Sequence, residues 1–174
     1  DLDQDKKRVE FVDTIPMSTY LVAFIVGPFK ASRTVDVSGV PLRIIYPEGK
    51  DDLCDYALDV GEFALQYFSD YYKIPYPGDK LDMIAIPDFA FGAMENLGCI
   101  TYREALLLVD KNKATSNELM RIADVICHEI AHMWFGALVT MKWWNGIWLN
   151  EAFATFMATK AVAEYNLEWN RWAQ

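Results

Sequence analysis

Hydrophobic residues along the chain are grouped in short runs, and several of these runs have the composition of β-strands. Runs rich in β-branched and aromatic residues, bounded by glycine or proline, are typical of strands. The expected strands cover residues 20–26, 42–46, 81–86 and 99–102, with a further strand-like run at 137–143. The first of these, Tyr20–Val26, is predicted to be the clearest buried strand and ends before Gly27-Pro28.

Other apolar residues recur at helical spacing and predict three helices. The first runs from Leu53 to Tyr71 and stops before Pro75. The second begins at the capping box formed by Thr115 and Glu118 and ends near residue 136. An alanine-rich third helix is expected from about residue 147 to residue 165. Strands and helices mixed along the chain predict an α+β fold.

Composition excludes some function classes. The chain of 174 residues is 53% hydrophobic, which is enough to build a core, and its net charge of −9 without a basic run argues against binding to nucleic acid. No apolar run is long enough to span a membrane. Three cysteines leave at least one unpaired, which slightly favours the cytoplasm but leaves the localisation open.

The second helix carries the stretch His128-Glu129-Ile130-Ala131-His132. Residues four apart on a helix lie about 40° apart, so His128 and His132 present their nitrogens to one point. Glu129 lies about 100° round the helix, where it can reach a water molecule as general base. Glu151 is the candidate for a third ligand. Three protein ligands leave a fourth position for water, which indicates a catalytic zinc site.

The alternative interpretation of this motif is two solvated surface histidines. Against it, the helix is apolar at the flanking positions, and Glu151 is expected to be buried in an alanine- and phenylalanine-rich helix. A buried carboxylate is costly without a cation partner. The motif therefore predicts that the chain binds one Zn²⁺ ion.

A second motif, Gly92-Ala93-Met94-Glu95-Asn96, precedes the histidines. Alone, a glutamate in a glycine-flanked loop is usually a solvated turn. Beside a zinc site, the Glu95 carboxylate could bind the ammonium group of a peptide's first residue. The scissile bond would then lie one residue in from the end.

The two motifs, in this order and followed by Asn150-Glu151, resemble those of the gluzincin zinc aminopeptidases, the family of aminopeptidase N and the puromycin-sensitive aminopeptidase. The segments 16–24, 101–104 and 148–151 resemble that family too, so the likeness covers almost all of the chain from about Val9 onward. Departures at Met133, Ala137 and Ala152 lie beside the expected ligands and not at them.

The resemblance implies a fold, a domain organisation and roles for the site residues. Residues 1–27 would be the final strands of a preceding β-rich domain, and residues 28–174 the first half of a thermolysin-like catalytic domain built from a small mixed sheet and active-site helices. His128, His132 and Glu151 would bind the zinc ion, and Glu129 would be the general base. The substrate-binding residues would be Gly92, Ala93, Met94, Glu95 and Asn96, with Glu95 holding the free amine and Ala93 and Met94 lying along the substrate backbone.

The function implied is an aminopeptidase that acts on peptides with a free N-terminus, in company with the remainder of the catalytic domain and flanking domains. A tyrosine beyond Gln174 stabilises the tetrahedral intermediate in the family, so this chain alone is expected to hold zinc but to hydrolyse peptides poorly. Three alternatives stay open: a thermolysin-like endopeptidase, an epoxide-hydrolysing aminopeptidase, which Ala93 disfavours, and a non-catalytic peptide-binding module.

Overall fold

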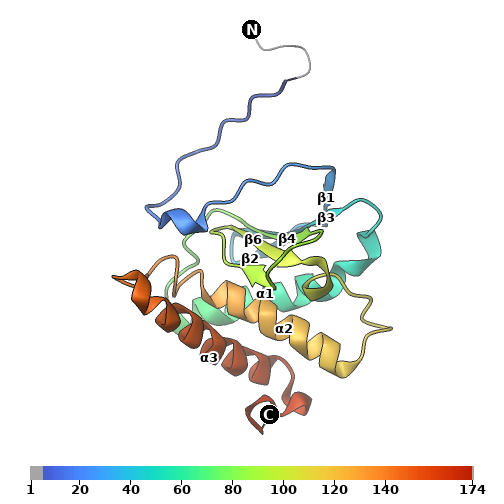
Figure 1. Cartoon of the computed structure of the whole chain (residues 1–174). Coiled ribbons are helices and arrows are strands. Elements are labelled where there is room, and N and C mark those ends of the chain that lie inside the picture. The colour runs from blue at the N-terminus through green and yellow to red at the C-terminus, as the bar shows by residue number, and fades with distance from the viewer. Residues whose placement is uncertain (1–5, 174) are drawn as a thin grey trace.

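A mixed β-sheet forms the centre of the computed structural model, which describes residues 6–173 (Figure 1). The described strands are β1 (Phe29–Ala31), β2 (Val35–Val37), β3 (Val40–Pro47), β4 (Leu81–Ile86), β5 (Ala93–Met94) and β6 (Cys99–Arg103). They follow the order β1-β3-β4-β6-β5, and β2 also pairs with β3. The strands predicted at 42–46, 81–86 and 99–102 are thus confirmed, as is the α+β class.

The middle of the sheet is parallel and its edges are antiparallel. β4 runs parallel to both β3 and β6, whereas β1, β2 and β5 pair antiparallel with their neighbours. Five of the six residues of β4 are buried, as expected for a central strand that is covered on both faces. The short edge strand β5 carries two residues of the second motif.

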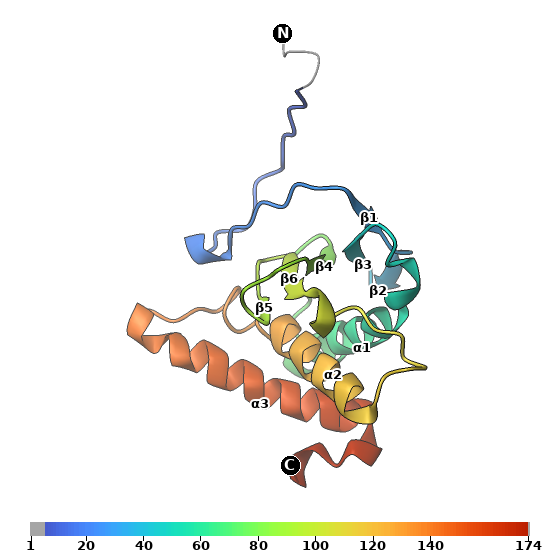
Figure 2. The ribbon, with the colours of Figure 1, turned by 45° about the vertical axis from the view of Figure 1, so that its right-hand side comes forward.

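Three long helices pack together beside the sheet. They are α1 (Asp55–Tyr72), α2 (Ser116–Ala131) and α3 (Ile147–Tyr165), which confirms the three predicted helices. α2 lies between α1 and α3, and α1 packs against the sheet (Figures 1 and 2). Gly61 permits that packing, because a Cβ atom there would lie 2.5 Å from Cε of Met83 on β4. None of the described helices is long and apolar enough to cross a membrane.

The prediction of a buried strand over Tyr20–Val26 is wrong. Within residues 6–27 the only regular element is a 3₁₀ turn, η1 (Thr19–Leu21), and Phe24 and Val26 are exposed. A strand needs a neighbour for its backbone hydrogen bonds, and no strand of the described chain pairs with this segment. The strands expected within residues 1–27 are therefore absent from 6–27, and residues 1–5 lie outside the described part. The domain division stays a prediction.

The expected strand-like run over 137–143 is also wrong. Gly136 has a φ of +137°, and the chain folds back there so that its N–H donates to the carbonyl of Val139 at 2.7 Å. The one β-type contact of this run among the described residues is an isolated bridge between Phe135 and Val139. The run forms turns and irregular structure, and the 3₁₀ turn η4 (Trp144–Gly146) leads directly into α3.

Candidate active site

Helix α2 carries the two histidines at its C-terminal end. Its N-terminus is fixed by the predicted capping box, in which the Thr115 hydroxyl accepts from the Glu118 N–H and the Glu118 carboxylate accepts from the Thr115 N–H. One turn of helix separates His128 from His132, the C-cap residue, and their Nε2 atoms lie 3.1 Å apart. The geometry expected from helical spacing is thus present.

Glu151 reaches the same point from α3, one turn after that helix begins. Its Oε2 lies 3.2 Å from Nε2 of His128, and its Oε1 lies 3.7 Å from Nε2 of His132. The neighbouring imidazoles, His128 first and His132 second, hold the pKa of the Glu151 carboxyl well below its usual range. The expectation of a buried Glu151 is wrong, because 52% of its side chain is exposed.

The outer nitrogens of both imidazoles have partners of their own. Nδ1 of His132 lies 3.0 Å from the carbonyl oxygen of Phe135, and Nδ1 of His128 lies 3.3 Å from the Thr155 hydroxyl. A carbonyl only accepts, so Nδ1 of His132 carries a hydrogen, and a neutral ring then has its lone pair on Nε2. That lone pair faces Nε2 of His128 and the carboxylate of Glu151. The convergence of three such donors fits a metal cation.

Glu129 lies between this cluster and the second motif. Its side chain is 6% exposed, and its Oε2 has no hydrogen-bond partner among the described residues. Burial raises the pKa of Glu129 to about 8; the His132 ring opposes that rise, and the Glu95 and Glu151 carboxylates add to it. A buried, unpaired carboxyl with a displaced pKa is typical of a functional site.

Glu95 is buried beside Glu129. Ligand atoms of Glu95, Glu129 and His132 lie within 4.8 Å of one another, as do those of His128, His132 and Glu151. The two groups share His132, so the two sequence motifs meet in one place. Both carboxyls of the first group are buried, so two acidic groups lie next to the histidines.

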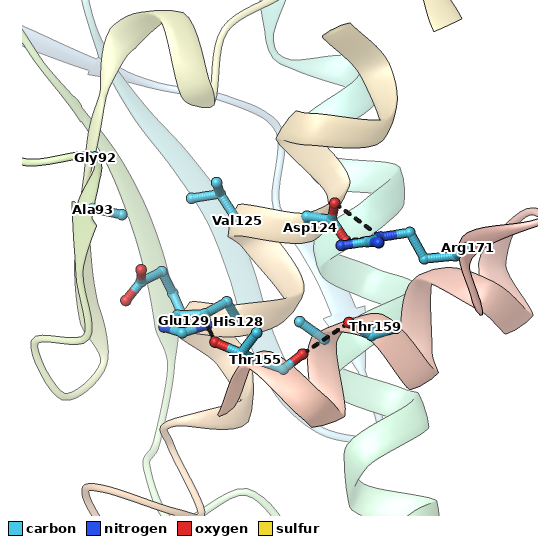
Figure 3. Close-up of a pocket in the computed structure, with 10 residues that line it drawn as sticks. Gly92, Ala93, Asp124, Val125, His128, Glu129, Thr155, Thr159 and Arg171 are labelled. Atoms are coloured by element: carbon cyan, nitrogen blue, oxygen red, sulfur yellow. Dashed lines mark hydrogen bonds and ion pairs between the residues drawn. The ribbon is translucent and has the colours of Figure 1, made fainter. Parts of the chain in front are cut away.

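The other residues of the second motif are divided between two hollows. Gly92 and Ala93 line a pocket of about 290 Å³ together with His128 and Glu129 (Figure 3). Figure 3 also shows an ion pair between Arg171 and Asp124, which both line that pocket. Nε of Arg171 lies 3.0 Å from Oδ1 of Asp124. Met94 and Asn96 line a different hollow, beside the N-terminal segment.

Asn96 has a role that the sequence did not indicate. Its side chain donates to the carbonyl of Leu21 at 3.2 Å and accepts from the Thr101 hydroxyl at 3.0 Å. These hydrogen bonds of the buried amide hold the loop in place, and the predicted contact of Asn96 with substrate stays a prediction. We therefore place it among the residues that support the site.

The comparison with known protein families covers the part of the chain that contains the site. The model of the peptidase family M1 domain matches residues 56–174, which include both motifs and all three convergent donors. The chain belongs to peptidase family M1. The resemblance to zinc aminopeptidases is thereby confirmed at the level of the family.

Several M1 relatives are aminopeptidases by name. The chain is 46% identical to aminopeptidase M1-D of Oryza sativa subsp. japonica over 97% of this chain and 19% of the relative. It is 46% identical to aminopeptidase M1 of Arabidopsis thaliana over the same shares. With endoplasmic reticulum aminopeptidase 1 of Mus musculus it shares 51% identity over 86% of this chain and 16% of that protein. The chain thus spans about a fifth of the length of these relatives.

Two features of this M1 site escaped the sequence analysis. Gly136 lies against His132, and a Cβ atom there would be 2.9 Å from Nδ1 of the ring, but its sequence position indicated only a helix stop. Tyr20, in the run taken for a strand, directs its hydroxyl to Gly136 and Asn150. No local pattern could have revealed contacts between segments so far apart in the sequence.

Proposed function

We propose that this chain carries the metal-binding and general-base part of a zinc-dependent aminopeptidase with a thermolysin-like catalytic domain. The observation that carries the proposal is the convergence of His128, His132 and Glu151, whose ligand atoms lie within 4.8 Å of one another. The names of the M1 relatives support the activity. When bound, Zn²⁺ would supply a Lewis acid that polarises water and the peptide carbonyl.

The remaining roles belong to the two buried carboxyls. Glu129 would accept a proton from the attacking water and pass it to the leaving amine, since it lies in the wall of the pocket. Glu95 would pair with the ammonium group of the substrate's first residue. A cation is the natural occupant of the spot between Glu95, Glu129 and the His132 ring, where two buried carboxylates would otherwise repel each other.

Gly92 and Ala93 would lie along the substrate backbone, because they line the same pocket as His128 and Glu129. β5, which contains Ala93, pairs only with β6 among the described strands, so its outer edge retains backbone groups that can pair with an extended peptide. Such pairing would orient the substrate beside Glu95. Met94, which lines the other hollow, would contribute its backbone more than its side chain.

The test compares a short peptide that has a free amine with its N-acetylated twin. It is made on the longest native protein that carries this sequence, because the chain spans about a fifth of its relatives. Cleavage of only the free-amine peptide, one residue from its end, is expected. Equal cleavage of both peptides would overturn the role of Glu95 and favour an endopeptidase, and zinc binding without any cleavage would favour a peptide-binding module.

A further inference from the structure

The 3₁₀ turn η1 (Thr19–Leu21) touches both parts of the candidate site, although it belongs to the N-terminal segment outside the sheet. In Figures 1 and 2 this blue turn lies near the N-terminal end of α3. Asn96, the neighbour of Glu95, donates to the carbonyl of Leu21. Tyr20, the preceding residue, reaches the metal-binding side. Adjacent residues of one turn therefore contact the two motifs.

The Tyr20 hydroxyl links the segments that follow and precede the expected ligands. It donates to the carbonyl of Gly136 at 3.4 Å and accepts from Nδ2 of Asn150 at 3.3 Å. Gly136 belongs to the turn after His132, and Asn150 directly precedes Glu151. The Tyr20 ring packs edge to face on Trp144, just before α3, with ring centroids 5.3 Å apart. The phenol thus bridges the end of α2 and the start of α3.

Asn150 depends on this contact. Its side chain is 1% exposed, and its Oδ1 has no hydrogen-bond partner among the described residues. Its Nδ2 has a second contact only with the sulfur of Met141 at 3.3 Å, which is a weak acceptor. Burial, with the Glu95 carboxylate as the next cause, raises the pKa of Tyr20 to about 12, so the hydroxyl stays protonated. Tyr20 can then donate and accept at once, as the two hydrogen bonds require.

We propose that Tyr20 is a positioning residue of the metal site, which orients Glu151 through Asn150 and holds the turn after His132 through Gly136. The inference rests on the proposed function for the identity of the metal. It assigns a part of the site to the N-terminal segment, whose composition had predicted only a strand. Tyr20 needs no contact with substrate or metal in this role. Outer partners of metal ligands typically contribute tenfold to a hundredfold to metal affinity.

The experiment uses the longest native protein with this sequence and two matched variants, Tyr20→Phe and Tyr56→Phe. Each variant loses one phenol oxygen; that of Tyr56 donates to the carbonyl of Leu119 at the other end of α2. Zinc affinity is measured by competition with a chelator, and ligand geometry by the visible spectrum of the cobalt-substituted protein. Circular dichroism checks that both variants fold. We expect Tyr20→Phe to bind zinc about tenfold or more weakly with an altered cobalt spectrum, and Tyr56→Phe to match the parent in both.

A double-variant cycle tests the route through Asn150. If Tyr20 acts through that amide, Asn150→Ala weakens zinc binding by a similar factor, and the double variant is no worse than the worse single variant. Additive losses would overturn the route through Asn150. Unchanged affinity and spectrum in Tyr20→Phe, with a parent that binds zinc, would overturn the inference alone. A parent that binds no zinc would overturn the proposed function and the inference with it.

Discussion

The histidine half and the loop half of the candidate site are held in place by different interactions. The histidine half, comprising His128, Glu129 and His132, stands on one capped helix, so its geometry follows from the helical repeat. The loop half, residues 92–96, has only the two-residue strand β5 as regular structure. It is held by hydrogen bonds to other segments.

Two side chains hold the loop half and the residues just before it. The Arg103 guanidinium donates to the carbonyls of Phe89 and Ala90, and Asn96 joins the loop to Leu21. Local periodicity is thus enough to bring His128 and His132 together, whereas the position of the loop half depends on contacts between distant segments. Changes in the two halves should therefore affect different measured quantities.

The largest expected effect is that of Glu129→Gln, in the histidine half. Removal of the general base should lower turnover about 10²–10⁴-fold, since that is the usual contribution of positioned acid–base catalysis. Zinc should still bind, because Glu129 is not among the three convergent donors. Turnover and bound zinc are measured on the same preparation. A variant with nearly parental turnover would rule out the assigned role.

Glu95→Gln is the matching change in the loop half. A hydrogen bond to a charged group contributes about 1.5–3 kcal/mol, so kcat/KM for free-amine peptides should fall about tenfold to a hundredfold. Zinc affinity should stay within a few-fold of the parent. Steady-state kinetics and a zinc titration check both points. If the variant lost zinc and kept its preference for free amines, the two halves would not be separable in this way.

Gly136→Ala should affect the histidine half through the turn behind it. An alanine at a φ of +137° is strained, by about 1–3 kcal/mol, and its Cβ would displace the ring of His132. Thermal unfolding should show the loss of stability, and zinc affinity should fall about tenfold. Gly39→Ala is the control, because Gly39 has a φ of +89° with nothing within 4 Å of the new Cβ. Equal zinc affinities in the two variants would contradict the contact with His132.

The smallest effect is expected for Thr115→Ala, at the far end of α2. Loss of the N-cap should destabilise the protein by about 1 kcal/mol without changing zinc affinity. Hydrogen bonds from Thr115 lower the pKa of Glu118 in the folded protein, so this contribution is present above the ordinary carboxyl pKa and is lost as pH falls through the lowered value. The difference in unfolding free energy between parent and variant should therefore shrink in acid, where the hydroxyl-to-carboxylate bond is lost, without vanishing, because the Thr115 hydroxyl still accepts from the Glu118 N–H. A constant difference down to low pH would argue against the capping box.

Sequence reasoning succeeded where structure is local. Helical spacing predicted α1, α2 and α3, and it also predicted that His128 and His132 would share one face. It failed at residues 20–26 and 137–143, because apolar, β-branched composition describes a strand only when a neighbour supplies the hydrogen bonds. The contacts of Tyr20 and Gly136 were not predictable, since they join segments that only the folded chain brings together.

The environment of Glu151 was also beyond prediction from local sequence. Its position one turn into α3 was predicted, but its exposure was not, because exposure depends on which face of the alanine-rich helix meets α2. The two motifs did predict that both would serve one site. Their meeting at His132 depends on β5 lying beside β6, which no single segment encodes.

Zinc binding by the parent and by Glu151→Ala tests the central claim most directly. Because the Glu151 side chain is 52% exposed, its removal should leave the fold intact, which the thermal unfolding of the metal-free proteins can verify. We predict that the parent binds one zinc ion per chain. The zinc affinity of the variant should be lower by a factor of about a hundred or more, since a direct ligand should matter at least as much as an outer partner. A variant that holds zinc as tightly as the parent would contradict the assignment of His128, His132 and Glu151 as the metal site.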